Sequence, residues 1–185
     1  MEYHLTTPCT AEDLKPLKAG DTVLLSGVVY TARDQAHKRM LEALDKGEPL
    51  PFDLEGSAIY YVGPTPERPG EVIGSAGPTT SGRMDAMSPR LLDLGNKIMI
   101  GKGKRDEAVK AAVVRNGAVY LAALGGAGAL MAQSVKTLEV IAWPDLGCEA
   151  VRRLTVENMP LTVILDAHGG DLYLSGPEAY LNAAK

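Results

Sequence analysis

Cysteine is scarce in this chain. Cys9 and Cys148 are the only two cysteines among its 185 residues, and no Cys-x-x-Cys pair exists. A metal cluster held by three or four thiolates is therefore arithmetically impossible within this chain alone. The three histidines, His4, His37 and His168, are equally scattered, which disfavours a self-contained zinc site. We predict that the chain holds no metal by itself.

Positive charge and long apolar runs are also lacking. The formal net charge is −4, whereas a nucleic-acid surface needs a basic excess. No stretch approaches the roughly 18 to 20 apolar residues of a membrane span. The first ten residues, MEYHLTTPCT, contain neither the basic leader nor the apolar run of a signal peptide. We therefore expect a cytoplasmic protein with no nucleic-acid or membrane partner.

The composition that is present is that of a globular domain. Apolar residues make up 45% of the chain and charged residues 23%, and the chain is long enough to bury a core without disulfides. Segments of strand length alternate with segments of helical periodicity, which predicts an α/β fold in a single domain over residues 1–185. Strands are expected at residues 22–31, 57–62, 72–76, 97–100, 118–124, 138–143 and 161–166. Helices are expected at 33–46, 88–94 and 106–116, within 125–134, from 146 and near the C-terminus.

Two glycine-rich stretches fail as nucleotide-binding motifs. In the run 126–131, GAGALM, Met131 stands where a dinucleotide fingerprint needs its third small residue. The run 101–105, GKGKR, lacks the Ser or Thr that follows the lysine of a P-loop. Neither stretch therefore predicts a nucleotide site.

The segment 77–85, GPTTSGRMD, has the parts of a small-anion site. Its two glycines let backbone amides approach a ligand, its three hydroxyls donate or accept, and Arg83 is able to grip a carboxylate with two parallel hydrogen bonds. The segment follows one expected strand and precedes a helix, where the ligand-binding loops of α/β proteins cluster. The alternative is a turn in which Arg83 pairs with Asp85 and merely holds the loop.

Two further candidates follow expected strands, and a third lies in a helix. Arg33 and Lys102 each come just beyond a strand end, and with Arg83 they would place cations at both ends of a dicarboxylate. Each alone is more typical of a solvated surface charge. His37 lies one helical turn after Arg33, so the two side chains can share a face. A lone helical histidine more often packs or caps than acts as an acid or base.

Five segments, in this order, resemble one known family. They are VYTARDQAHKR at 29–39, GPTTSGRMD at 77–85, MIGKGKRDEAV at 99–109, VYLAALGGAGALMAQSV at 119–135 and VENMPLTVILDAHGGDLY at 156–173. The chain resembles the β subunit, or fused C-terminal domain, of class I, iron–sulfur-dependent fumarate hydratases and L(+)-tartrate dehydratases. The resemblance covers most of the chain.

This resemblance implies a fold and a partner. The fold would be a three-layer, swivelling β/β/α domain. In the family, a separate α subunit or N-terminal domain holds a [4Fe–4S] cluster, so the resemblance implies that the cofactor lies on a partner chain and that the enzyme is a hetero-oligomer. The two unpaired cysteines of this chain agree with that division.

The resemblance also assigns roles. Thr79 would be the base that removes a proton, and Thr80 would bind substrate beside it. Arg83, Arg33 and Lys102 would hold the substrate carboxylates. His37 and Asp85 are candidates for supporting roles, and Ser81 is given no direct role.

The function implied is that of a lyase subunit. The chain would serve a hydro-lyase that reversibly adds water to a C4 dicarboxylate, with fumarate and (S)-malate as the first choice and L(+)-tartrate as the alternative. A non-catalytic dicarboxylate-binding module and a purely structural subunit are alternatives of another class. The residues do not discriminate between these substrates, because all of them carry two carboxylates.

Overall fold

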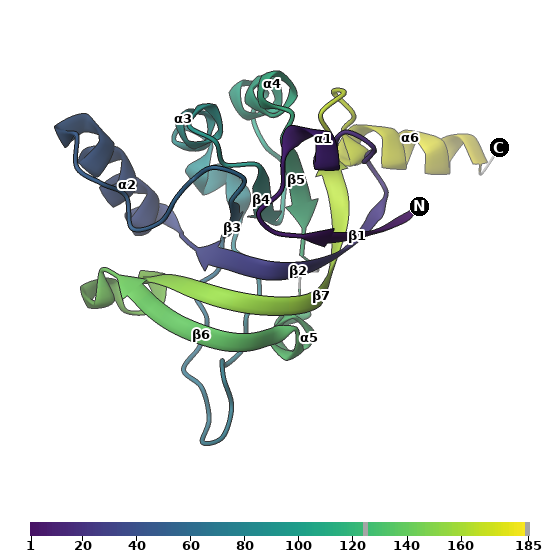
Figure 1. Cartoon of the computed structure of the whole chain (residues 1–185). Helices are drawn as coiled ribbons and strands as arrows, with labels where there is room; N and C mark the ends of the chain where they lie inside the picture. Colours follow the sequence, from purple (N-terminus) through teal and green to yellow (C-terminus); the bar gives the residue numbers. More distant parts are fainter. Residues whose placement is uncertain (124–125, 184–185) are drawn as a thin grey trace.

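The computed structural model describes residues 1–123 and 126–183, and it has a mixed α/β fold (Figure 1). The strands are β1 (Glu2–Thr6), β2 (Thr22–Thr31), β3 (Ala58–Tyr60), β4 (Ile98–Gly101), β5 (Val119–Ala122), β6 (Val135–Ala142) and β7 (Val151–Leu165). The α-helices are α1 (Ala11–Leu14), α2 (Asp34–Lys46), α3 (Ser88–Asp93), α4 (Glu107–Asn116), α5 (Gly128–Gln133) and α6 (Leu172–Ala183). Two 3-10 helices, η1 (Ser81–Met84) and η2 (Pro144–Glu149), complete the elements.

The seven strands form one sheet that is partly closed into a barrel. Their order is β1-β2-β3-β4-β5-β7-β6, and β2 also pairs with β7, so that β2, β3, β4, β5 and β7 form a ring. Strands β1 to β5 pair in parallel with their neighbours, while β7 runs antiparallel to β2, β5 and β6. The long strand β7 closes the ring because it pairs with β2 along most of its length and with β5 near its carboxyl end, while its first half also pairs with β6.

A bulge in β2 accompanies this closure. The pairing of β2 with β7 shifts register between Leu25 and Gly27. Gly27 has a φ of 101°, and a Cβ there would lie 2.5 Å from Thr7 Oγ1. Only glycine therefore fits at this close approach, and such bulges increase strand twist and bending.

Two apolar cores lie on opposite faces of the central strands. One fills the barrel interior and includes Leu25, Tyr60 and Leu121. The other includes Tyr61 and Met99 and packs the opposite face against α2, α3 and α4, which lie on one side of the sheet (Figure 1). Successive strand residues point to opposite faces, which is why neighbours such as Tyr60 and Tyr61 belong to different cores.

The helix ends follow their sequence signals. Gly47 ends α2 in the left-handed region at φ 70°, and its N–H bonds back to carbonyls of the last turn. The Asp106 side chain caps α4 by accepting from the Val109 N–H at 2.9 Å, and Gly117 ends that helix at φ 58°. None of the helices within residues 1–123 and 126–183 is long and apolar enough to cross a membrane.

Most expected elements are confirmed, and some are wrong. The strand at 22–31 and the helix at 33–46, which begins one residue later, are present. The expected strand at 118–124 is β5, although residue 124 lies outside the described residues. The expected strand at 72–76 is wrong, because this segment is irregular. It forms the second half of a loop whose two ends are joined by hydrogen bonds between Thr65 and Ser75. The expected helix from 146 is instead η2, and β7 begins at Val151, ten residues before the expected strand.

Candidate active site

The sequence-predicted residues meet at the carboxyl ends of three neighbouring parallel strands. Arg33 lies two residues after β2, and Lys102 directly follows β4. The Thr79 N–H donates to the carbonyl of Tyr61, the residue just after β3, at 2.8 Å. Because β2, β3 and β4 are adjacent and parallel, these three positions share one edge of the sheet, where α/β folds place ligands.

The segments 77–85 and 101–105 form one structural unit. The Ser81 N–H donates to the Lys102 carbonyl at 2.8 Å, and the Lys102 N–H donates to Ser81 Oγ at 3.0 Å. Thr80 and Lys102 also pair as a parallel β-bridge. The segment 77–85, which carries the hydroxyls, and the segment 101–105, which carries Lys102, are therefore fixed relative to each other by hydrogen bonds of their main chains.

Two tyrosines hold the residue after Lys102. The Gly103 N–H donates to the Tyr173 hydroxyl at 3.1 Å, and the Tyr120 hydroxyl donates to the Gly103 carbonyl at 2.9 Å. Burial raises the pKa of Tyr120 well above its usual range, so that its hydroxyl keeps its proton. Gly103 has a φ of 88°, which glycine adopts readily. The N–H and the carbonyl of Gly103 thus both have hydrogen-bond partners.

Asp85 belongs to a buried ion pair and not to a pair with Arg83. Arg105 Nε donates to Asp85 Oδ1 at 2.5 Å, and the Asp106 N–H donates to Asp85 Oδ2 at 2.7 Å. The Arg105 guanidinium also donates to Ser88 Oγ at 2.9 Å and lies near the rings of two tyrosines. The alternative of a holding pair between Arg83 and Asp85 is therefore wrong, because Arg105 takes that carboxylate. Sequence reasoning missed Arg105, since nothing in GKGKR separates it from its exposed lysine neighbours.

Arg33 and Arg83 are brought together through one acidic residue. Asp34 Oδ2 lies 3.9 Å from Arg33 Nε and 3.8 Å from Arg83 Nη1. A second carboxylate, that of Glu149 on η2, lies 3.3 Å from Arg33 Nη2. Gly63 makes room for this arrangement, since a Cβ there would lie 2.7 Å from Arg33 Nη1. Sequence reasoning predicted the two arginines but neither carboxylate.

These two guanidiniums are balanced in charge without being hydrogen-bonded to the carboxylates. All three contacts lie outside the range of about 2.7–3.2 Å that an N–H···O hydrogen bond occupies. By contrast, Arg115 donates to both oxygens of Asp93, each at 2.8 Å. Arg33 Nε is buried and has no hydrogen-bond partner in the described part of the chain. Except for this buried Nε, the N–H groups of Arg33 and Arg83 are not committed to carboxylates and therefore remain available to a ligand.

His37 packs beneath this cluster. Its side chain is fully buried, edge-on to the Tyr61 ring, and Nδ1 lies 3.0 Å from the Arg33 carbonyl. A carbonyl only accepts, so Nδ1 carries the proton of the neutral ring. Burial lowers the pKa of His37 to about 4. Through this hydrogen bond to the Arg33 carbonyl, His37 supports the backbone at the start of α2.

Comparison with known proteins identifies the family of the chain. A family model described as the fumarase C-terminus matches residues 1–176. The chain belongs to the fumarase C-terminal family. It is 39% identical to "Fumarate hydratase 2" of Leishmania major over 93% of the chain, but covers only 33% of that protein. It is 34% identical to "L(+)-tartrate dehydratase subunit beta" of Escherichia coli K12, over 93% of the chain and 87% of that protein.

A third relative is likewise much longer than the part that this chain matches. The chain is 40% identical to "Fumarate hydratase class I, aerobic" of Escherichia coli K12 over 80% of its own length and 28% of that protein. The chain thus spans about a third or less of the fumarate hydratases that it matches, but most of the tartrate dehydratase subunit.

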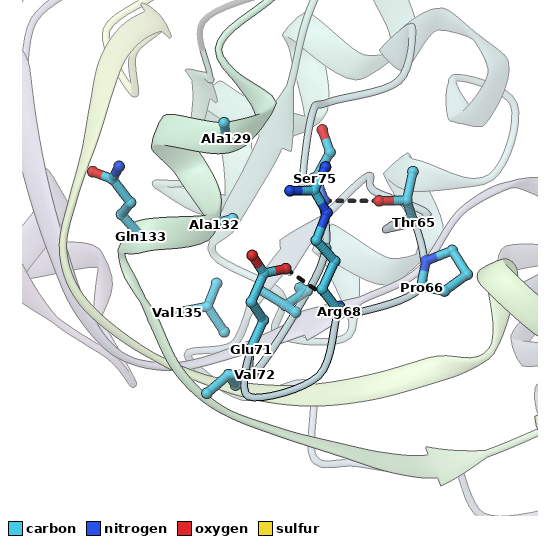
Figure 2. Close-up of a pocket in the computed structure, with 12 residues that line it drawn as sticks. Thr65, Pro66, Arg68, Glu71, Val72, Ser75, Ala129, Ala132, Gln133 and Val135 are labelled. Atoms are coloured by element: carbon cyan, nitrogen blue, oxygen red, sulfur yellow. Dashed lines mark hydrogen bonds between the residues drawn. The ribbon is translucent and has the colours of Figure 1, made fainter.

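Two pockets of this fumarase C-terminal chain lie away from the strand ends. One of about 490 Å³ and another of about 460 Å³ flank the loop 64–75, which projects past β6 on the side away from α2, α3 and α4 (Figure 1). In the first pocket, Glu71 accepts from the Arg68 N–H at 3.3 Å, within the loop itself (Figure 2). Neither pocket is lined by a sequence-predicted site residue. We place the candidate site at the strand ends because the cations converge there.

The described residues do not gather the side chains that a metal centre needs. Among residues 1–123 and 126–183, no three His, Cys, Asp or Glu side chains lie close enough to hold a metal ion. Cys9 is buried, and burial raises its pKa to about 11, whereas Cys148 is exposed on η2. These two thiols do not provide the ligands of an iron–sulfur cluster.

Proposed function

We propose that this chain is the β subunit, or C-terminal-type catalytic domain, of a hydro-lyase that reversibly adds water to a C4 dicarboxylate. The observation that carries the proposal concerns Arg33 and Arg83. Their guanidiniums lie near the same carboxylate but donate no hydrogen bond to it. A planar guanidinium with free N–H groups is suited to bidentate binding of a carboxylate. Membership of the fumarase C-terminal family supports the same reading.

In this proposal, three cations bind the two carboxylates. Arg33 and Arg83 come from the start of α2 and from η1, and Lys102 comes from the end of β4. The Lys102 side chain is exposed, and its main chain is fixed by Ser81. Exposed Thr80, paired with Lys102 along the backbone, supplies a further hydroxyl to the substrate.

Thr79 is proposed as the base that removes the proton beside a substrate carboxylate. Its N–H bond to Tyr61 holds its main chain at the end of β3, between the strand ends that carry Arg33 and Lys102. A threonine hydroxyl is a weak base, so the alkoxide form needs stabilisation. The neighbouring cations supply positive charge where negative charge develops during the reaction.

The remaining half of the site belongs, in this proposal, to a partner. We propose a cluster-bearing α subunit as that partner, with a [4Fe–4S] cluster on the partner and none on this chain. The name of the Escherichia coli relative, a beta subunit, supports a divided enzyme. Purified alone, the chain is expected to carry no stoichiometric iron or sulfide and to show no hydratase activity. Activity of the chain without partner or iron would contradict the proposal.

We further propose that residues 1–185 act as one domain of the swivelling β/β/α kind and that it works in the cytoplasm. The two apolar cores support the layered description, since one lies within the curved sheet and the other between sheet and helices. A change in the relative orientation of this chain and its partner, seen by small-angle scattering with and without a dicarboxylate, would test the swivel.

The substrate is proposed to be fumarate and (S)-malate, with L(+)-tartrate as the alternative. Relatives bear both names at similar identity, so parallel assays are needed. Co-expression with the α subunit under anaerobic conditions, followed by assays of fumarate hydration and tartrate dehydration, is the direct test.

Variants separate the classes of function in the same assay. Thr79→Ala and Arg83→Ala are each expected to abolish most turnover in the complex. Thr137→Ala, at an exposed position of β6, and Arg90→Ala, which removes an exposed pair with Asp45, are the matched controls. Full turnover in a complex carrying both Thr79→Ala and Arg83→Ala would favour a purely structural subunit. Tight dicarboxylate binding by the isolated chain, lost in Arg83→Ala, would favour a binding module.

A further inference from the structure

The carboxylate of Asp34 faces both substrate-binding arginines. Its Oδ2 atom is buried, accepts no hydrogen bond from the described residues, and lies 3.8 Å and 3.9 Å from guanidinium nitrogens of Arg83 and Arg33. The two arginines come from segments 50 residues apart in the chain. Asp34 is therefore the electrostatic link between the start of α2 and η1.

We propose that Asp34 is a positioning residue, the shared counter-charge that aligns Arg33 and Arg83 for the dicarboxylate; this inference rests on the proposed function. Two guanidiniums near one oxygen repel each other, and a carboxylate between them offsets that repulsion. Contacts near 4 Å supply this attraction without occupying N–H groups. The arginines thereby stay close to each other and still present their donors to substrate.

A simpler role for Asp34 is capping of the helix, because an acidic residue in the first turn interacts favourably with the helix dipole. The backbone amide at this end is already bonded elsewhere, since the Gln35 N–H donates to Glu149 Oε2 at 3.0 Å. The N-cap residue itself, Arg33, makes no side-chain capping hydrogen bond. The buried oxygen of Asp34 instead points to the arginines.

Arg83 depends on Asp34 more than Arg33 does. Arg33 has a second carboxylate in Glu149 and a side chain only 20% exposed. The Arg83 side chain is 54% exposed, and within residues 1–123 and 126–183 its only ion pair is the one with Asp34. Without this carboxylate, Arg83 has more rotamers to lose when it binds substrate.

The test uses the complex with the cluster-bearing subunit and compares Asp34→Asn with Asp45→Asn. Asp45 lies on the same helix, and its Oδ1 pairs with Arg90 at 2.6 Å, so the control removes the same charge from an exposed ion pair. Asp34→Asn is expected to raise KM about tenfold while kcat changes less than about threefold, and Asp45→Asn is expected to change neither. An unchanged KM in Asp34→Asn would overturn the inference.

A double-mutant cycle tests whether Asp34 acts through Arg83. The probe is succinate, a saturated C4 dicarboxylate that cannot lose water, with its Kd measured by calorimetry on the complex. Asp34→Asn is expected to weaken succinate binding about tenfold in the wild-type background and less than about twofold in Arg83→Ala, where only its smaller effect through Arg33 remains, because residues that share one interaction are not additive. Additive effects would overturn the inference and leave the proposed function intact. Full turnover in Arg83→Ala would instead overturn the proposed function.

Asp34→Glu keeps the charge and covers the case in which Asp34→Asn does not assemble. Its longer side chain displaces the carboxylate, so a smaller rise in KM is expected, and this rise is again expected to shrink in the Arg83→Ala background. An undiminished rise in that background would contradict positioning through Arg83.

Discussion

The hydroxyl of Tyr173 accepts a hydrogen bond from the backbone N–H of Gly103 at 3.1 Å, across 70 residues of sequence. Tyr173 lies in the first turn of α6, whereas Gly103 follows the proposed substrate-binding Lys102. The C-terminal helix therefore contributes to the shape of the loop that carries Lys102.

Tyr173→Phe is expected to weaken substrate binding without unfolding the chain. The substitution removes only the acceptor of the Gly103 N–H, which is worth about 1 kcal/mol in a typical case. If this loosens Lys102, KM of the complex rises about fivefold, since 1.4 kcal/mol corresponds to about tenfold. Tyr180→Phe is the control, because Tyr180 lies on the same helix and is 76% exposed. Equal KM values in the two variants would contradict a role for the Tyr173 hydroxyl.

The buried pair of Arg105 and Asp85 is expected to dominate the stability of the site. The Arg105 side chain is fully buried and that of Asp85 is 12% exposed. Asp85→Ala leaves the guanidinium without its counter-charge, and loss of one partner of a buried pair costs about 3–5 kcal/mol. Asp93→Ala breaks the half-exposed pair with Arg115 and the hydrogen bond from Asn116, and it is expected to cost less than Asp85→Ala because water solvates the freed groups. The measurement is the free energy of urea unfolding, and equal losses in the two variants would contradict the burial argument.

The sequence predicts those site residues that follow strand ends, but not the partners that hold them. Arg33 and Lys102 follow apolar strands, and Arg83 lies in a distinctive run of glycines and hydroxyls. Their partners Glu149 and Tyr173 come from elements distant in the chain, and only the closure of the barrel decides which elements meet. Local pattern carries no information on such contacts.

The same contrast holds for the strands. The sequence predicts strand β2 at its observed bounds because all of its ten residues except Ser26 and Gly27 are apolar or β-branched. The first part of β7 was missed because Arg152, Arg153 and Glu157 interrupt its apolar alternation, and Pro160 argues against a strand interior. These residues are tolerated because β7 changes neighbours along its length and leaves several of its side chains at least partly exposed.

The buried ring of His37 is expected to make stability depend on pH. Burial lowers its pKa to about 4, from about 6.5 in an unfolded chain. Between these values the unfolded state binds more protons, so the stabilising contribution is complete above about pH 6.5 and is lost as the pH falls toward 4. The expected slope from this one group is about 1.4 kcal/mol per pH unit.

Urea unfolding of wild type and His37→Gln between pH 4 and 7 isolates this slope, because the carboxylates contribute equally to both proteins. The difference between their free energies of unfolding is expected to shrink as the pH falls, since the wild type alone must leave a neutral ring buried. His4→Gln is the control, because His4 lies on β1 with a side chain 68% exposed. A difference that stays constant with pH would show that His37 has the same pKa in the folded and unfolded chains. The conclusion that the buried ring stays neutral would then be wrong.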